Sequence, residues 1–164
     1  MEIGPIQNED VLLIQAVIKM TCPSVLVELG YLNGFSTRKI LEVMREDAHL
    51  TSYDNTVINS NITDARFTFK NKSQTEVDEK NIDFIFFDAS HNLDLNKETL
   101  LKVEKTLNKN AIIAIHDTGI WNEMVMDTGG YWVKDGYVHR PDEREFVKWL
   151  KEKGFNIINL GTTT

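Results

Sequence analysis

Acidic and imidazole side chains follow four of the predicted strands in this sequence, at the point where each strand ends. In chain order they are Glu28, Asp54, Asp88 and the pair His116-Asp117. Carboxylates accept hydrogen bonds and hold divalent metals, and an imidazole can act as a general base near neutral pH. In open α/β sheets, ligands bind in the crevice at the carboxyl ends of the strands. Any one of these residues could be a turn or cap residue, but together they predict a site.

Two glycines lie between the first of these acids and the next predicted helix, in the segment Glu28–Thr37. Gly30 and Gly34 allow tight backbone turns and close approach to a ligand. The segment is neither a G-x-G-x-x-G fingerprint nor a P-loop, because it lacks the third glycine and the Gly-Lys-Ser/Thr sequence. Backbone donors without a lysine suit a carboxylate better than a triphosphate. Asp54, at the end of the next strand, is placed to accept hydrogen bonds from ribose hydroxyls.

The elements that must position these residues alternate between strands and helices along the chain, which predicts βαβ units and a parallel sheet. The expected strands are Val25–Leu29, His49–Tyr53, Arg66–Phe69, Ile82–Phe87, Ala111–Ile115 and Phe155–Leu160. The expected helices are Glu9–Met20, a helix capped by Ser36 or Thr37 and ending near Met44, Leu93–Leu107, and a helix capped by Asp142 that ends at Gly154 and buries Phe146, Val147 and Leu150. We therefore expect one α/β domain over residues 1–164.

Bulk composition excludes several classes of protein. The net charge of −7 disfavours a nucleic-acid binder, which would carry a basic face. The apolar stretch Val11–Ile18 is too short to span a bilayer, and the acidic N-terminus is not a signal peptide. The lone Cys22 fits a reducing compartment, where it is best explained as a small buried residue. We expect a cytoplasmic protein, and the sequence leaves open whether it forms a homo-oligomer.

Three segments of the chain resemble one family in order and spacing. The segment Glu28-x-Gly30-x-x-x-Gly34-x-Ser36-Thr37 looks like motif I of the class I S-adenosylmethionine (SAM)-dependent methyltransferases. Residues 82–91 (IDFIFFDASH) and 111–118 (AIIAIHDT) resemble two strands of the subgroup related to small-molecule O-methyltransferases, the methyltransferase domain family 24. The resemblance implies a single Rossmann-like three-layer sandwich with a mostly parallel central sheet.

The sequence departs from the family pattern in two places. The chain ends at Thr162-Thr163-Thr164, where the family makes a turn before a final antiparallel strand, so either the sheet lacks that strand or the sequence is truncated. Ala89-Ser90 stand where the subgroup often has Gly-Asp, which removes one acid from the site.

The resemblance also implies roles for individual residues. Glu28 would lie under the cofactor and face its amino group, and Asp54 would hold the ribose. The full set of implied cofactor contacts is Glu28, Gly30, Gly34, Phe35, Ser36, Thr37, Asp54, Asn55, Ser73 and Asp88. Ser73-Gln74 follow the third strand, where the family often contacts adenine, although Asn71–Ser73 is equally an ordinary polar loop.

The acceptor side of the site would contain the groups that handle a proton. An oxygen acceptor must lose its proton, either to a general base or because a bound metal lowers the pKa of the oxygen. His91 and His116 are the candidate bases, with Asp88 or Asp117 beside them, and His91 is slightly favoured because His116 could be a buried structural histidine. Related enzymes bind Mg²⁺ at positions matching Asp88 and Asp117, and His116 would replace one ligand. Because Mg²⁺ prefers oxygen ligands, His116 weakens that assignment or indicates a softer metal.

A long irregular segment, Thr118–Asp142, follows the fifth strand and is expected to be mobile and to form the acceptor side of the pocket. Its aromatic residues, Trp121, Tyr131, Trp132 and Tyr137, could equally line a pocket or pack the segment onto the sheet, and His139 is best explained as a polar residue on the surface.

Three functions are compatible with these patterns to different degrees. The favoured one is methyl transfer from SAM to an oxygen of a small-molecule or sugar-like acceptor. A SAM-binding module or regulatory subunit without catalysis is the main alternative, motivated by the short C-terminus and by Ser90. A nicotinamide oxidoreductase is disfavoured by the missing G-x-G-x-x-G.

Overall fold

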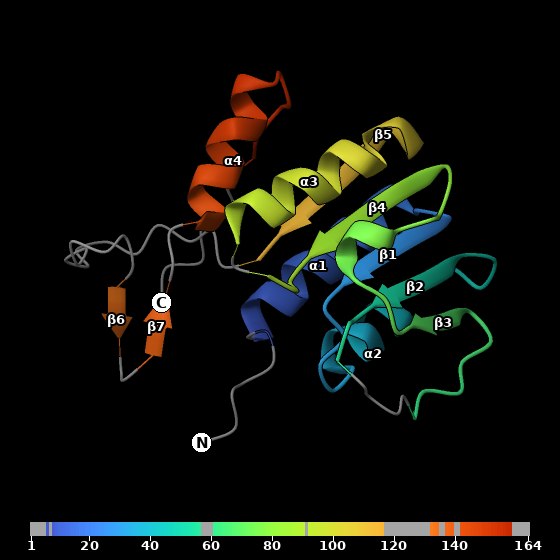
Figure 1. The fold of residues 1–164 in the computed structure, drawn as a ribbon. Coiled ribbons are helices and arrows are strands. Elements are labelled where there is room, and N and C mark those ends of the chain that lie inside the picture. The colour runs from blue at the N-terminus through green and yellow to red at the C-terminus, as the bar shows by residue number, and fades with distance from the viewer. Residues whose placement is uncertain are drawn as a thin grey trace.

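Five parallel strands form the central sheet, in the order β3-β2-β1-β4-β5 (Figure 1). Their bounds are β1 Val25–Leu29, β2 His49–Tyr53, β3 Phe67–Lys70, β4 Ile82–Phe87 and β5 Leu107–Ile115. The structure, a computed structural model, describes residues 6, 8–56, 61–90, 92–116, 132–134, 137–139 and 142–158. Central strands with apolar side chains on both faces need cover on both faces, which explains the continuous apolar runs of β1 and β4.

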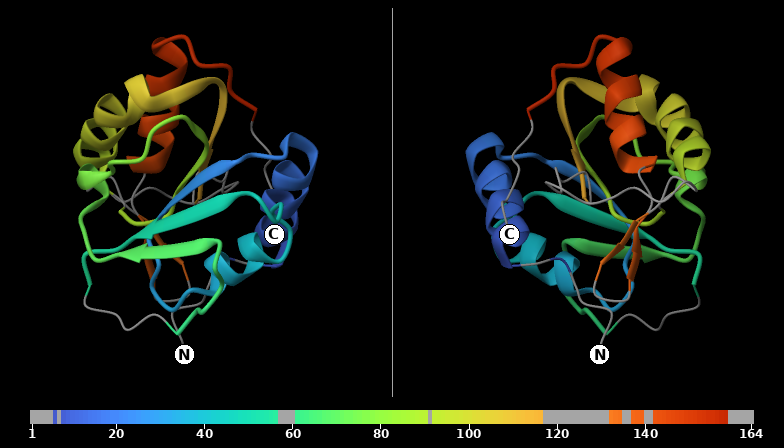
Figure 2. Two further views of the ribbon diagram at one scale, coloured as in Figure 1. Left: turned by 90° about the vertical axis from the view of Figure 1, so that its right-hand side faces the viewer. Right: turned by 90° about the vertical axis from the view of Figure 1, so that its left-hand side faces the viewer.

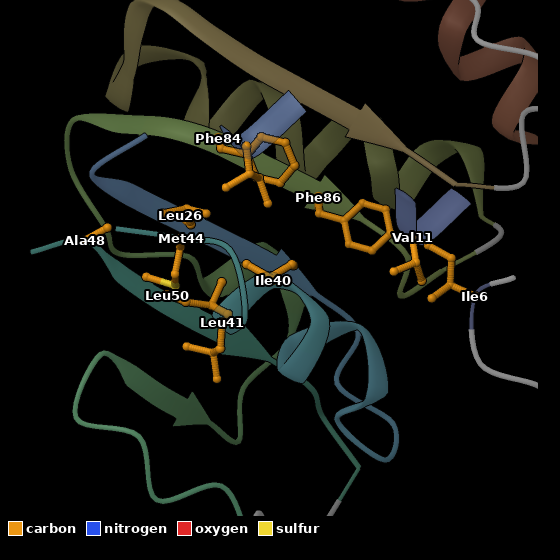
Figure 3. Close-up of a cluster of buried hydrophobic side chains, with 11 residues drawn as sticks. Ile6, Val11, Leu26, Ile40, Leu41, Met44, Ala48, Leu50, Phe84 and Phe86 are labelled. Carbon is orange, nitrogen blue, oxygen red and sulfur yellow. The ribbon is translucent and has the colours of Figure 1, made fainter. Parts of the chain in front are cut away.

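Four helices supply that cover, two on each face of the sheet (Figures 1 and 2). Helices α1 (Asn8–Thr21) and α2 (Phe35–Leu41) pack on one face, where their apolar side chains meet Leu26, Leu50, Phe84 and Phe86 (Figure 3). Helices α3 (Leu93–Val103) and α4 (Asp142–Glu152) pack on the other face. Their buried residues, Leu100, Val103, Phe146 and Leu150, contact the alternate side chains of the same strands, including Val27, Leu29, Ile85 and Phe87. The expected three-layer α/β sandwich is confirmed.

The strand order places the chain's reversal between β1 and β4. The chain runs outward from β1 through β2 to β3, then returns to add β4 on the other side of β1 and β5 beyond it. The loops that follow β1 and β4 therefore leave the sheet side by side and diverge. This is the topological switch point at which open α/β sheets bind ligands.

Most of the expected boundaries are confirmed. The ranges of β1, β2 and β4 are as predicted, and α1 and β3 differ from prediction by one residue at either end. Helix α2 begins at Phe35, two or three residues earlier than a cap at Ser36 or Thr37 would give, and ends at Leu41 rather than near Met44. Its N-cap is Gly34, without a side-chain cap. The predicted cap was wrong because the hydroxyls of Ser36 and Thr37 bind Glu28 instead.

Three other expectations were wrong. The helix predicted over Leu93–Leu107 ends at Val103, a short 3-10 helix η2 (Glu104–Thr106) follows, and β5 begins at Leu107. No strand forms over residues 155–158, the described part of the predicted last strand. The segment expected to be irregular contains an antiparallel hairpin of β6 (Trp132–Lys134) and β7 (Tyr137–His139), whose aromatic and β-branched residues favour extended backbone.

Apart from this hairpin and Asp142, with which α4 begins, the segment 118–142 lies outside the described residues, so its predicted mobility and its aromatic wall stay predictions. Among the described helices, none is long and apolar enough to cross a membrane.

Candidate functional site

Gly30 joins the loops that follow β1 and β4. Its φ is +99°, and a Cβ at this position would lie 2.5 Å from the carbonyl oxygen of Asp88 and 2.9 Å from Cα of Ala89. The Gly30 amide donates to the carbonyl of Tyr53 at 2.9 Å, and the Asp88 amide donates to the carbonyl of Leu29 at 2.9 Å. Only glycine fits at this point, where the ends of β1, β2 and β4 meet.

Gly34 closes the same loop by a second close approach. Its φ is +71°, and a Cβ here would lie 2.7 Å from the ring of Tyr31. That ring is buried against Phe67 and Phe69 of β3, with ring centroids 5.9 and 4.9 Å away. The loop between the two glycines, residues 30–34, is therefore pinned at both ends, and we call it the glycine loop.

Glu28 lies beneath the glycine loop, fully buried, and its carboxylate is held by three hydroxyls. Ser36 Oγ donates to Oε1 at 2.6 Å, and Thr37 Oγ1 donates to Oε2 at 2.5 Å. Ser52 of β2 also donates to Oε2. Burial raises the pKa of Glu28 to about 7, the three hydroxyls oppose that rise, and the charge of Asp88 adds to it. Glu28 thus ties the start of α2 to β2.

Asp54 holds the glycine loop from the side, through backbone amides. Its Oδ2 accepts from the amides of Tyr31 and Leu32, each at 3.0 Å, and its Oδ1 accepts from the amide of Thr56 at 2.8 Å. Burial raises the pKa of Asp54, but these amides and the Thr56 hydroxyl outweigh it and hold the pKa below its usual value. A carboxylate offers about four hydrogen-bond acceptor positions. At Asp54, three of them are used by backbone amides, and the fourth is used only by the rotatable hydroxyl of Thr56.

Ser73 and Gln74 follow β3, and of the two only Gln74 is buried. Ser73 caps the short 3-10 helix η1 (Gln74–Glu76), accepting from the amide of Thr75 and donating its own amide to Glu76. The Gln74 amide group is buried and donates to Asn96 and Thr99 of α3, each at 2.9 Å. The Gln74 side chain, predicted to contact adenine, is therefore hydrogen-bonded to α3 instead. A contact of Ser73 with adenine stays a prediction.

Two neighbouring predicted contacts lie closer to the loop. Asn55 is exposed beside Asp54, and Phe35 is half-buried at the start of α2. Asn71 donates to the carbonyl of Thr56 at 2.7 Å, which ties the turn after β2 to the turn after β3.

His116 is the imidazole of the site, and it lies between two carboxylates. Its Nδ1 is 3.0 Å from Oδ1 of Asp88, and its Nε2 is 3.4 Å from Oδ2 of Asp10 on α1. The edge of its ring faces Phe86, with centroids 6.4 Å apart. The side chain is 19 % exposed.

Asp10 was not predicted from the sequence, because an acid in the first turn of an amphipathic helix is explained by the helix dipole alone. Asp10 and His116 are 106 residues apart in sequence, and only the packing of α1 onto the sheet brings them together.

A second polar cluster, also missed, anchors the ends of β2 and β3. The Tyr53 hydroxyl lies within hydrogen-bond distance of the carboxylates of Asp78, at 2.8 Å, and Glu79, and Lys70 binds both acids and the hydroxyl. Desolvation and the contact with Glu79 raise the pKa of Tyr53 far above its ordinary value. The cluster stabilises the strand ends that carry Asp54 rather than offering a reactive group.

The remaining predicted residues are outside the described part of the chain, namely His91 and Asp117. The predicted metal set of Asp88, His116 and Asp117 can be judged only in its first two members. These two contact each other, with Nδ1 of His116 3.0 Å from Oδ1 of Asp88, and the set as a whole stays a prediction. Within the described ranges, no group of three or more histidine, cysteine or acidic side chains could hold a metal.

Comparison with known proteins adds family and fold information to this geometry. Residues 27–118 match a family model described as a methyltransferase domain. No curated protein sequence matches the chain. Among solved structures, the chain is similar to a Staphylococcus aureus protein assigned as a caffeoyl-CoA O-methyltransferase, with 18% identity, a TM-score of 0.69, and coverage of 94% of this chain and 79% of that one.

Two further structures show the same fold. One is an O-methyltransferase from Bacillus cereus in complex with S-adenosylhomocysteine (SAH), with 17% identity, a TM-score of 0.64, and coverage of 93% and 73% of the two chains. The other is a SAM-dependent O-methyltransferase from Thermotoga maritima, with 17% identity, a TM-score of 0.62, and coverage of 91% and 51%. At these identities the similarity establishes the fold alone.

Proposed function

Because a family model matches more than half of its length, the chain belongs to the methyltransferase domain family, and we propose that it transfers a methyl group from SAM to an oxygen of a small-molecule or sugar-like acceptor. The observation that carries the proposal is the meeting of the glycine loop, Asp54, and the Asp88–His116 pair at one edge of the sheet. The oxygen acceptor is favoured because an imidazole paired with a carboxylate can take the proton of a hydroxyl.

The hydrogen-bond acceptors at this edge of the sheet fit SAM. Asp54 is ionised at neutral pH, since its pKa lies below the ordinary value. A ribose hydroxyl can replace the Thr56 hydroxyl at Asp54 without disturbing the amides that hold the loop. When bound, SAM supplies a methyl group on a sulfonium, which an acceptor oxygen can displace in line.

In this proposal Glu28 supports the loop from beneath. Its two oxygens already accept three hydroxyl hydrogens, from Ser36, Thr37 and Ser52. A direct contact with the amino group of the cofactor, as the family resemblance implies, would have to be made in addition to these. We expect Glu28 to act mainly by fixing the start of α2 and the loop above it.

His116 is the base in this proposal, and Asp88 orients it. A hydrogen bond from Nδ1 to Asp88 leaves Nε2 as the nitrogen that takes the proton. Nε2 faces Asp10 at 3.4 Å, so the acceptor hydroxyl would have to take the place of Asp10 at this nitrogen, and the Asp88 carboxylate would stabilise the imidazolium that forms. Holding the acceptor in line contributes up to about 7–11 kcal/mol of the barrier reduction, and general base catalysis contributes less. His91 keeps its place as the second candidate.

The test is incorporation of isotope-labelled methyl groups from SAM into a panel of acceptors, with catechols, phenols and sugars compared with amines and thiols. Labelled product from a hydroxylated acceptor, and from no matched amine, is expected. A protein that binds SAM and SAH by calorimetry but labels none of the acceptors would favour the non-catalytic SAM-binding module instead.

A further inference from the structure

Three polar side chains are buried where helix α3 packs against the segment that follows β3, and we call them the polar network. Gln74 comes from η1, and Asn96 and Thr99 come from α3. A buried polar group costs free energy unless it is hydrogen-bonded. The partners of these three side chains therefore indicate what the polar network does.

Asn96 is the branch point of the polar network. Its Oδ1 accepts from Nε2 of Gln74 at 2.9 Å, and its Nδ2 donates to the backbone carbonyl of Ser90 at 3.0 Å. Because a carbonyl can only accept, the bond to Ser90 fixes the orientation of the Asn96 amide. Nε2 of Gln74 also donates to Thr99 Oγ1 at 2.9 Å, and that hydroxyl donates to the carbonyl of Leu95 within α3. Asn96 is thus the member of the network that reaches the loop after β4.

The carbonyl that Asn96 holds belongs to the loop that carries Asp88. Asp88 lies two residues before Ser90, and its Oδ1 is 3.0 Å from Nδ1 of His116. On its other side, the same loop makes the close approach to Gly30. The loop is therefore held on the side of β1 by Gly30 and on the side of α3 by Asn96.

We propose that Asn96 is a positioning residue for methyl transfer. Its hydrogen bond to the Ser90 carbonyl fixes the loop after β4, and the fixed loop in turn places Asp88 against His116. This inference rests on the proposed function, in which His116 takes the proton of the acceptor. Asn96 is 2 % exposed, so it acts through the loop and not by contact with the acceptor. Without this bond the loop can shift, and Asp88 can move away from the imidazole.

The experiment compares Asn96→Leu with Thr99→Val. Each substitution is close to isosteric and removes one of the two acceptors of Gln74 Nε2, so both should lower the stability of the folded state. Only N96L also removes the donor to the Ser90 carbonyl. T99V therefore measures what a defect in the polar network does by itself.

The first measurement uses the ligand-free protein. The imidazole nitrogen signals of His116, assigned in NMR spectra by comparison with H116Q, report the hydrogen bond between Nδ1 and Asp88. We expect N96L to shift these signals and T99V to leave them at their wild-type positions. Asn96→Ser takes the place of N96L if N96L does not fold, because the shorter side chain cannot reach Ser90 but leaves room for a water molecule.

The second measurement is methyl transfer from labelled SAM to a hydroxylated acceptor, at a temperature at which the variants are folded. N96L should lose roughly tenfold or more in kcat, because a small misplacement of the groups at the reacting centre is costly. Its KM for SAM should change by less than about threefold, since the glycine loop and Asp54 are held by other contacts. T99V should keep both constants within about twofold of the wild type.

The positioning role is overturned if N96L keeps the wild-type His116 signals or the wild-type kcat. It is also overturned if T99V loses as much as N96L, because the polar network would then be purely structural. A wild-type protein that methylates no hydroxylated acceptor would instead overturn the proposed function, and the role of Asn96 in turnover with it. The His116 signals still decide in that case whether Asn96 places Asp88.

Discussion

Gly30 lies so close to Asp88 that a Cβ at position 30 would come within 2.5 Å of the Asp88 carbonyl oxygen. This contact locks the loop after β1 to the loop after β4, which carries the acid paired with His116. The two halves of the proposed site, cofactor side and acceptor side, therefore depend on one glycine.

We predict that Gly30→Ala destabilises the protein by about 2 kcal/mol or more, since backbone strain is added to overpacking against another backbone segment. Gly154→Ala is the control, because Gly154 also has a positive φ, of +94°, but nothing lies within 4 Å of its Cβ position. Chemical denaturation measures both variants. Equal losses at the two positions would show that the Asp88 contact contributes nothing.

The buried carboxyl of Glu28 should make stability depend on pH. Its pKa is about 7 in the folded protein, against an ordinary value of 4.5 for a glutamate side chain. Because the folded pKa is the higher one, the favourable contribution of this group is complete below about pH 4.5 and is lost as the pH rises to 7. The difference corresponds to about 3 kcal/mol, as an order of magnitude.

Glu28→Gln removes this titration, so the free energy of unfolding of the wild type should fall relative to E28Q between pH 4.5 and 7. Unfolding curves collected at several pH values give the comparison. Ser52→Ala, which removes one hydroxyl donor, should shift the fall to higher pH. Parallel pH profiles for the wild type and E28Q would contradict the raised pKa.

Asp54 should both hold the glycine loop and bind the ribose of the cofactor. Asp83 is a control that should have a structural role only. Asp83 also binds two consecutive amides through one oxygen, those of Ser24 and Val25 at 2.8 and 3.0 Å, but it lies at the opposite edge of the sheet. We expect Asp54→Asn and Asp83→Asn each to cost roughly 1.5–3 kcal/mol of stability.

Only D54N should weaken SAH binding, by roughly tenfold or more, because it alone loses hydrogen bonds from the ribose hydroxyls to a charged acceptor. Calorimetry at a temperature where both variants are folded separates the two effects. If D54N and D83N bind SAH equally well, Asp54 only supports the loop.

The parts of this structure that the sequence predicts are those governed by local pattern. Strands β1 and β4 were predicted with their bounds because buried parallel strands are short apolar runs that end at polar residues, and β2, a mixed run, was predicted because Asp54 closes it. The convergence of Glu28, Asp54, Asp88 and His116 followed from the rule that parallel strands end at one edge.

The parts that could not be predicted depend on tertiary contacts. The hydroxyls of Ser36 and Thr37 bind a buried carboxylate rather than their own helix terminus, Gln74 turns inward to α3, and Asp10 reaches His116 across 106 residues. Each of these residues has an ordinary local explanation in the sequence. Only the three-dimensional packing shows that each of them makes a long-range contact instead.

The final prediction concerns proton transfer at His116. His116→Gln should retain SAH affinity and lose about 10²–10⁴-fold in turnover of a hydroxylated acceptor, the usual contribution of a general base. Asp10→Asn should cause a smaller loss, because Asp10 faces the other ring nitrogen at 3.4 Å and stabilises the imidazolium that forms.

The control for Asp10 is Glu9→Gln, which makes the same charge change on the same first turn of α1, at an exposed residue. A loss in D10N that E9Q shares would reflect α1 in general rather than contact with His116.

Full turnover in H116Q would remove His116 as the base and leave His91, for which His91→Gln is the corresponding variant. Loss of activity with a chelator and recovery with Mg²⁺, together with an inactive D117N, would instead assign the activation of the acceptor to a metal held by Asp88 and Asp117, because a bound divalent ion lowers the pKa of an oxygen ligand without any protein base.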